Sequence, residues 1–224
     1  MDFLEHLAPR LQPIVSLAGD ETWEVVFWEA LLGPISLLPD QSVLKTLRRA
    51  ELTGAVLDID TAMITAASRV PARTSVNISR RSIDLDALAL LATLDTARPD
   101  QLILEITERP SSTHADQFAH FVHESTRRGF ALALDDYGTG EHTRHSPMFT
   151  PLSRIVPAVV KLGLEPFRAV SILELKQMVR MCRRNDQLFV VEGVETASHL
   201  EKARAAGVPA AQGFFWRDRI PPPA

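Results

Sequence analysis

The chain has very little of what marks secreted, membrane-spanning or duplex-binding proteins. It contains one cysteine in 224 residues, so no internal disulfide can form, and we expect a reducing compartment such as the cytoplasm. No apolar run approaches the roughly 18 residues of a membrane span, and Asp2 and Glu5 argue against a secretory signal. No block of Lys or Arg is present and the net charge is -4, which excludes generic binding to DNA or RNA duplexes.

Two further absences narrow the choice of fold. No internal repeat, low-complexity stretch or linker divides the chain, so we expect residues 1–224 to form a single domain. No Gly-x-Gly-x-x-Gly turn follows the first predicted strand, although an open doubly wound sheet would want one. Hydrophobic residues make up 46% of the chain, which is enough for a large core. We interpret Cys182, in a predicted helix, as part of that core rather than as a nucleophile.

Short apolar segments alternate with amphipathic ones along most of the chain. Strands 11–17 and 22–32 are joined by a short link, which predicts an antiparallel pair. Further strands are predicted at 73–79, 101–106, 130–134, 155–161, 187–191 and 209–212. Helices are predicted at 2–7, 40–51, 58–70, 82–95, 114–128, 167–184 and 196–206. Repeated strand–helix units of this number and length favour an α/β fold with a closed TIM-like (β/α)8 barrel, with the open sheet as the alternative.

Two adjacent carboxylates, Asp135 and Asp136, follow the apolar strand 130–134 and precede the glycines of a flexible turn. Adjacent acids at the end of a buried strand repel each other and are costly to desolvate. A divalent metal ion is the obvious compensating charge, because hard cations prefer carboxylate oxygen. The alternative is a pair of solvated acids in a loop.

The other predicted strands also end in polar side chains, which favours the metal site. In a parallel barrel these ends open on one face, where active sites form. An oxygen-rich set selects Mg²⁺ or Mn²⁺ over Zn²⁺, and two such ions are common apparatus for hydrolysing phosphodiesters. The remaining strand-end residues are Glu29, Asn77, Glu105 with Glu108 after it, Lys161, Glu192 and Gln212.

These residues and their spacings resemble the EAL-domain family, the phosphodiesterases of the bacterial second messenger cyclic di-GMP. The resemblance covers about residues 11–222 and depends on seven short motifs in the family's order. They are Gln-Pro-Ile-Val at 12–15, Glu29-Ala30-Leu31, Val-Asn-Ile-Ser at 76–79, Glu-Ile-Thr-Glu at 105–108, Asp-Asp-Tyr-Gly-Thr-Gly at 135–140, Glu-Gly-Val-Glu-Thr at 192–196, and Gln-Gly-Phe at 212–214.

The resemblance implies a TIM-like barrel modified by one antiparallel strand, and hydrolysis of cyclic di-GMP to linear pGpG. It implies two Mg²⁺ or Mn²⁺ ions and a homodimer as one candidate assembly. The implied catalytic residues are Lys161 and Glu192, which hold or activate the attacking water, and Glu108, which pins the loop after Asp136. The implied substrate-binding residues are Gln12, Leu31 and Gln212. The implied metal ligands are Glu29, Asn77, Glu105, Asp135 and Asp136.

Three departures from the family pattern concern substrate binding and assembly. Gly33 stands where the family usually has an arginine that contacts a substrate phosphate, and Gly163 stands where it usually has an aspartate. Segment 141–153 lacks the family's usual start of a helix that helps to form the dimer. We therefore expect weakened substrate binding, unless Arg144 supplies the missing charge.

Two function classes stay open from the sequence. One is an active phosphodiesterase of cyclic di-GMP or of another nucleotide, and the other is a catalytically weak or inactive cyclic di-GMP receptor or interaction module on the same fold. A complete ligand set favours the enzyme, whereas the two glycines favour the receptor. We interpret the histidine pairs 120/123 and 142/145 as solvated surface rather than metal ligands.

Overall fold

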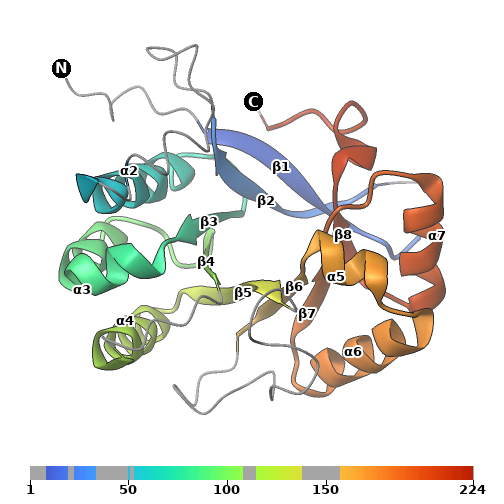
Figure 1. Ribbon diagram of the computed structural model, residues 1–224. Helices are drawn as coiled ribbons and strands as arrows, with labels where there is room; N and C mark the ends of the chain where they lie inside the picture. Colours follow the sequence, from blue (N-terminus) through green and yellow to red (C-terminus); the bar gives the residue numbers. More distant parts are fainter. Residues whose placement is uncertain are drawn as a thin grey trace.

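The structure is a computed structural model that describes residues 9–19, 23–33, 50, 53–107, 115–137 and 157–223. Within these residues eight strands close into one barrel in sequence order, which confirms the predicted TIM-like fold and excludes the open sheet (Figure 1). The strands are β1 (Pro9–Ser16), β2 (Val25–Leu32), β3 (Thr74–Ile78), β4 (Leu102–Thr107), β5 (Ala131–Tyr137), β6 (Val159–Leu162), β7 (Leu188–Val191) and β8 (Ala210–Gln212).

Strand β1 runs antiparallel to both of its neighbours, β2 and β8, while every other neighbouring pair is parallel. The predicted antiparallel start is therefore confirmed. Because β1 is reversed, its first residues lie at the same rim of the barrel as the last residues of the other strands. The register places Gln12 opposite Glu29, and Ile14 opposite Gln212.

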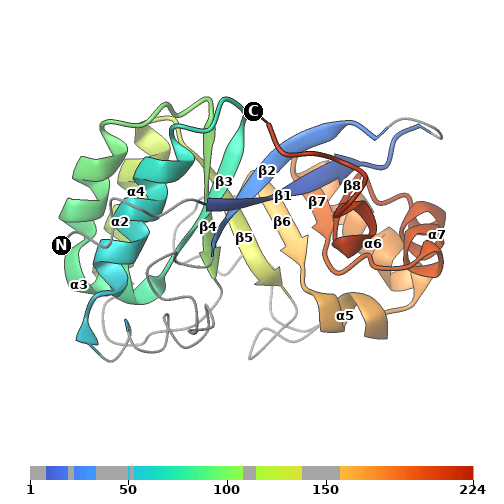
Figure 2. The ribbon, with the colours of Figure 1, turned by 90° about the horizontal axis from the view of Figure 1, so that it is seen from above.

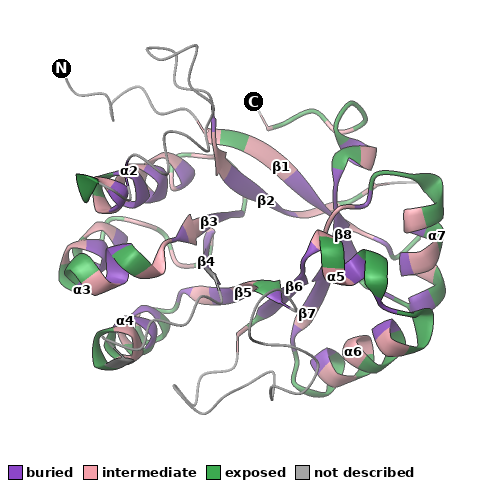
Figure 3. Cartoon of the chain, in the orientation of Figure 1, coloured by how far each residue is buried: buried purple, intermediate pink, exposed green. Residues whose placement is uncertain are grey.

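The helices lie in two groups that flank the barrel, with α2, α3 and α4 on one side and α5, α6 and α7 on the other (Figure 2). Their buried residues face the strands (Figure 3). Their bounds are α2 (Val56–Ala67), α3 (Arg80–Leu94), α4 (Ala115–Arg127), α5 (Leu164–Ala169), α6 (Ile172–Arg184) and α7 (Ala197–Ala206), followed by the 3₁₀ turn η2 (Phe214–Trp216). The helices predicted at 2–7 and 40–51 lie outside the described residues, apart from residue 50.

One predicted helix, 167–184, is wrong as a single element. The structure has α5 and α6 separated by Val170 and Ser171, both in extended conformation. Ser171 caps α6, because its side chain accepts a hydrogen bond from the Glu174 backbone while the Glu174 carboxylate accepts one from the Ser171 backbone. Leu173, in the first turn of α6, is 62% exposed. Cys182 is fully buried in α6, and burial raises the pKa of its thiol to about 12.

A layer of apolar side chains fills the inside of the barrel. Successive side chains of a strand alternate between its two faces, so residues two positions beyond this layer also point inward. Each strand therefore has one further inward-facing position next to the rim. The layer consists of Ile14, Phe27, Ile103, Ala133, Val159, Val190 and Ala210.

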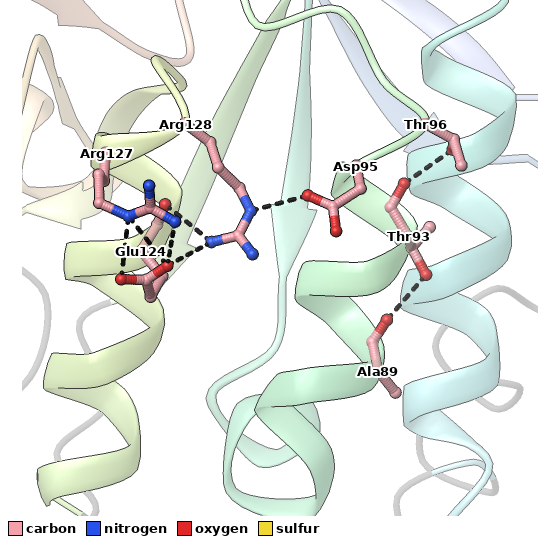
Figure 4. Close-up of polar contacts among 7 residues, drawn as sticks. All are labelled: Ala89, Thr93, Asp95, Thr96, Glu124, Arg127 and Arg128. Atoms are coloured by element: carbon pink, nitrogen blue, oxygen red, sulfur yellow. Dashed lines mark hydrogen bonds and ion pairs between the residues drawn. The ribbon is translucent and has the colours of Figure 1, made fainter.

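Ion pairs between arginines and carboxylates join the C-terminal ends of α4 and α3 (Figure 4). Arg127 and Arg128 both bind the Glu124 carboxylate, and Arg128 reaches across to Asp95, which caps the C-terminus of α3. The helix ends precede strands, so this network lies at the rim opposite the carboxyl ends of the strands. Exposed ion pairs of this kind contribute about 0–1 kcal/mol each, so we assign the network a minor role.

A buried acid in α2 holds the turn between β3 and α3. Asp60 is only 7% exposed, and its carboxylate accepts a hydrogen bond of 2.7 Å from the Ser79 backbone N–H. Ser79 is also the N-cap of α3 and follows Asn77 by two residues. Asp60 thus positions the backbone on which Asn77 stands.

We expect Asp60→Asn to stabilise the protein at neutral pH. Burial raises the pKa of Asp60 from 3.8 to about 6, although the Ser79 N–H opposes the shift. Between these values the native state binds more protons than the unfolded state, so stability falls as pH rises. A difference of about two pKa units corresponds to about 3 kcal/mol, which is the upper limit of the gain at pH 8.

Urea unfolding at pH 4 and pH 8 measures this effect. The gain of Asp60→Asn should fall below about 1 kcal/mol at pH 4, where Asp60 is protonated in the native state and about half protonated in the unfolded state. Asp58→Asn, at an exposed position in the same helix, is the matched control and should change little. An equal gain at both pH values would show that ionisation of Asp60 is not the cause.

Candidate active site

Every strand of the barrel places one polar side chain at the same rim. For seven of these eight side chains, the inward orientation can be inferred from the apolar layer. Each lies on the same strand as a member of that layer, two residues closer to the rim. Asn77 stands in the same relation to the buried Ser75 of β3. The eight residues are Gln12, Glu29, Asn77, Glu105, Asp135, Lys161, Glu192, which directly follows β7, and Gln212.

The Lys161 ammonium lies at the centre of this ring. Its Nζ is 2.8 Å from Glu105 Oε2 and 2.8 Å from Glu192 Oε1. It is also 3.1 Å from Asp135 Oδ1 and 3.2 Å from Glu29 Oε2. The Lys161 side chain is 1% exposed, and a buried ammonium is tolerated only when it is paired and hydrogen-bonded. The ion pairs therefore tie together β2, β4, β5, β6 and the end of β7, and we name these five residues the Lys161 cluster.

Two amides fix the Glu29 carboxylate from the sides. Asn77 Nδ2 donates a hydrogen bond of 2.9 Å to Glu29 Oε1, and Gln212 Nε2 donates one to Glu29 Oε2. Burial alone would raise the pKa of Glu29, but the Lys161 charge and these two donors bring it below its ordinary value. Glu29 is therefore ionised at neutral pH and held in one orientation.

The other two glutamates of the cluster hold their protons more tightly. Burial, followed by repulsion from Glu29, raises the pKa of Glu105 to about 8. Burial also raises the pKa of Glu192 to about 7, although Lys161 opposes the shift. The neighbouring carboxylates raise the pKa of Lys161 well above its ordinary value, against the effect of burial. One ammonium thus does not neutralise the cluster, which retains capacity for further positive charge.

The donor set fits a hard divalent cation. Glu105 Oε1 and Gln212 Oε1 are buried oxygens without a hydrogen-bond partner, and carboxylate and amide oxygens are the ligands that Mg²⁺ and Mn²⁺ prefer. Among the described residues, however, no group of three or more His, Cys, Asp or Glu side chains is arranged to hold a metal ion. The point on which the carboxylates converge is taken by the Lys161 ammonium, so metal binding requires these side chains to rearrange.

The structure separates the two adjacent acids. Asp135 points into the barrel, whereas Asp136 is exposed, has a φ of 55° and is not among the ion pairs of Lys161. The register of β5 against β6 also shifts between Leu134 and Tyr137. The strand continues through both acids to Tyr137 instead of ending at residue 134 as predicted.

The remaining predicted residues take different places. Leu31 is half-buried two residues beyond Glu29, and Gly163 precedes α5 as its N-cap. Glu195 pairs with Arg168 at 2.8 Å on the surface and is no member of the Lys161 cluster. Glu108 and the whole of 141–153, with Arg144, His142 and His145, lie outside the described residues. His120 and His123 are exposed on α4, in agreement with their interpretation as surface.

Sequence reasoning missed that Lys161 is the shared counter-ion of the carboxylates. The signal was present in the strand Val-Val-Lys-Leu at 159–162, because a lysine inside an apolar strand is almost never buried without a paired acid.

No helix among the described residues is long and apolar enough to cross a membrane.

Known proteins and solved structures are similar to this chain. The probable cyclic di-GMP phosphodiesterase PdeD of Escherichia coli is 30% identical over 126 residues, which is 54% of this chain but only 22% of PdeD. The manganese and cyclic di-GMP complex of Klebsiella pneumoniae BlrP1 superposes with a TM-score of 0.69 at 25% identity, over 93% of this chain and 57% of that one. The FimX EAL domain of Pseudomonas aeruginosa has the same fold, with a TM-score of 0.76 at 20% identity over 99% of this chain and 93% of its own. Residues 4–218 match the EAL domain family as a whole, and the chain therefore belongs to that family.

Proposed function

We propose that this chain is a divalent-metal-dependent phosphodiesterase that hydrolyses cyclic di-GMP to linear pGpG. The observation that carries the proposal is the Lys161 cluster, in which four carboxylates from separate strands surround one ammonium at the rim of the barrel. The names of the relatives support the choice of substrate. The chain spans about a fifth of PdeD and just over half of the BlrP1 chain, so the activity is a proposal for this chain.

The proposed metal ligands are Glu29, Asn77, Glu105, Asp135 and Asp136, holding two Mg²⁺ or Mn²⁺ ions. Divalent ions, when bound, supply charge stabilisation at the phosphate and lower the pKa of a water molecule. The hydrogen bonds from Asn77 and Gln212 keep Glu29 in a fixed orientation for this task. The further ligand Asp136 needs a movement, because its side chain is exposed.

The proposed proton acceptor is Glu192. Its pKa of about 7 lies near the operating pH, where a general base combines a sufficient ionised fraction with sufficient basicity. The Lys161 ammonium, 2.8 Å from Glu192 Oε1, orients this carboxylate and stabilises its ionised form. Gln12, Leu31 and Gln212 are the proposed substrate contacts, and Glu108 is proposed to pin the loop after Asp136.

Metal binding is expected to strengthen as pH rises toward 8. The pKa of the proposed ligand Glu105 is raised to about 8, so at lower pH a metal ion must displace its proton. For each displaced proton, the affinity for Mn²⁺ should fall by up to about tenfold for every unit by which the pH decreases. Calorimetric titration with Mn²⁺ in two buffers of different ionisation enthalpy measures the protons released. Metal binding without proton release at pH 6.5 would contradict these assignments.

The proposed reaction is tested by incubating the protein with cyclic di-GMP and Mg²⁺ or Mn²⁺ and separating the products by chromatography. We expect pGpG to form, and excess chelator to stop its formation. Turnover that persists unchanged in chelator would overturn the metal-dependent mechanism. Metal and cyclic di-GMP binding without any turnover would instead support a receptor or interaction module, the alternative favoured by Gly33 and Gly163.

A single domain over 1–224, a homodimer and a cytoplasmic location stay predictions.

A further inference from the structure

We propose that Arg10 and Arg217 bind the second phosphate of the cyclic dinucleotide, the one that lies away from the Lys161 cluster. This inference rests on the proposed function and names the source of a charge that the site otherwise lacks. Gly33, buried just after β2, has no side chain with which to contact an anion. The chain carries a net charge of -4 and the cluster itself is acidic, so a phosphate beyond the metal ions needs a separate cation.

Arg10 lies on the strand next to the position of the missing side chain. The register of β1 and β2 pairs Gln12 with Glu29 and Arg10 with Leu31. Positions 10, 12 and 14 share one face of β1, and Ile14 belongs to the layer inside the barrel, so Arg10 projects from the barrel mouth. Two strand residues span about 7 Å, which places Arg10 beyond the cluster but within reach of the same ligand. Gly33 follows the end of β2, two residues beyond Leu31.

Arg217 and Arg10 line the same pocket. The pocket is open to solvent, and its lining includes Arg10, Gln12, Gly213, Phe214, Arg217 and Ile220. It therefore extends from a proposed substrate contact, Gln12, to the residues that follow Gln212. The segment after η2 runs beside the start of β1 (Figure 1), and its residues form one side of the pocket.

The pocket combines charge with an aromatic surface. The Arg217 guanidinium lies 5.5 Å from the centre of the Phe214 ring, and that ring is 53% exposed. An exposed ring beside cations is suited to a nucleotide, because a base can stack on the ring while a guanidinium binds the phosphate.

The two arginines have no acidic partner among the described residues. Arg80, Arg98, Arg127, Arg128 and Arg168 each form an ion pair with a carboxylate. No such ion pair, and no side-chain hydrogen bond, is formed by Arg10 or Arg217 within the described ranges. Both arginines are exposed and line the same pocket. A phosphate matches guanidinium donors better than any other group of a cyclic dinucleotide.

The test is the affinity for cyclic di-GMP of Arg10→Ala, Arg217→Ala and the double variant, titrated calorimetrically with Ca²⁺ present. Loss of charge-assisted contacts should weaken binding by about tenfold to a hundredfold in the double variant. Arg10→Lys and Arg217→Lys should restore part of the loss, because they keep the charge. Arg183→Ala, at an exposed position on α6, is the matched control and should bind as the wild type does. Because both pocket arginines are exposed, we expect the melting temperatures of the variants to equal that of the wild type. Equal melting temperatures would show that the fold is intact.

Equal affinity of the double variant and the wild type would overturn the inference and leave the phosphodiesterase proposal intact. A loss of affinity in Arg144→Ala without any loss in the pocket variants would also overturn the inference. The positive charge would then come from the segment that follows Asp135 and Asp136. A wild-type protein that binds cyclic di-GMP but does not hydrolyse it would overturn the enzyme proposal alone. The arginine contacts would still be measurable by the same titrations.

Discussion

Lys161→Met is expected to remove turnover and to destabilise the metal-free protein by about 3–5 kcal/mol, the usual cost of breaking a buried ion pair from one side. Methionine keeps an unbranched side chain but leaves four carboxylates without their shared cation. These groups must then take up protons or remain unpaired in a buried site. The deficit should therefore grow as pH rises, because the carboxyls are neutral only at low pH.

Urea unfolding at pH 6 and pH 8 without metal measures the stability of Lys161→Met, and the chromatographic assay measures its turnover. Lys202→Met is the matched control, since Lys202 Nζ donates hydrogen bonds of 2.7 Å and 3.1 Å to the backbone carbonyls of Phe167 and Arg168. The control should cost about 1 kcal/mol and leave turnover intact. A Lys161→Met protein as stable as the wild type at pH 8 would show that the lysine does not hold the cluster together.

Asp135→Asn is expected to lower turnover by at least about a hundredfold while the fold stays intact, a loss typical of removing one preorganised electrostatic group. The variant keeps the shape of the side chain but removes a charge that would compensate the metal ions. Lys161 retains Glu29, Glu105 and Glu192 as partners, and the repulsion among the carboxylates decreases. The melting temperature without metal should therefore hold or rise.

The rise in melting temperature on adding Mn²⁺ separates a metal ligand from a structural acid. It should shrink in Asp135→Asn, because a weaker metal site stabilises the native state less. Asp218→Asn, at an exposed position after η2, should behave like the wild type in every measurement. A large loss of stability in metal-free Asp135→Asn would mark Asp135 as structural and contradict its role as a ligand.

Local patterns were enough for the barrel and for most of the site. Strands of alternating or continuous apolar residues separated by helices predict a parallel barrel, and in such a barrel all strand ends meet at one rim. Glu29, Glu105, Asp135, Lys161, Glu192 and Gln212 could thus be brought together from their places along the chain. The break before α6 was also readable, since Ser171 and Glu174 have the spacing of a capping box.

Features that depend on register and on long-range electrostatics required the tertiary structure. The alternation of side chains cannot tell which of two adjacent acids turns inward, because the positive φ of Asp136 and the register shift in β5 interrupt it. Strand ends do not reveal that one ammonium pairs with four carboxylates, because its position depends on distances between strands far apart in sequence. Arg10 lies opposite Leu31, two residues before Gly33, only through the pairing of β1 with β2. It shares a pocket with Arg217 only through closure of the barrel at β8, and no local pattern encodes either arrangement.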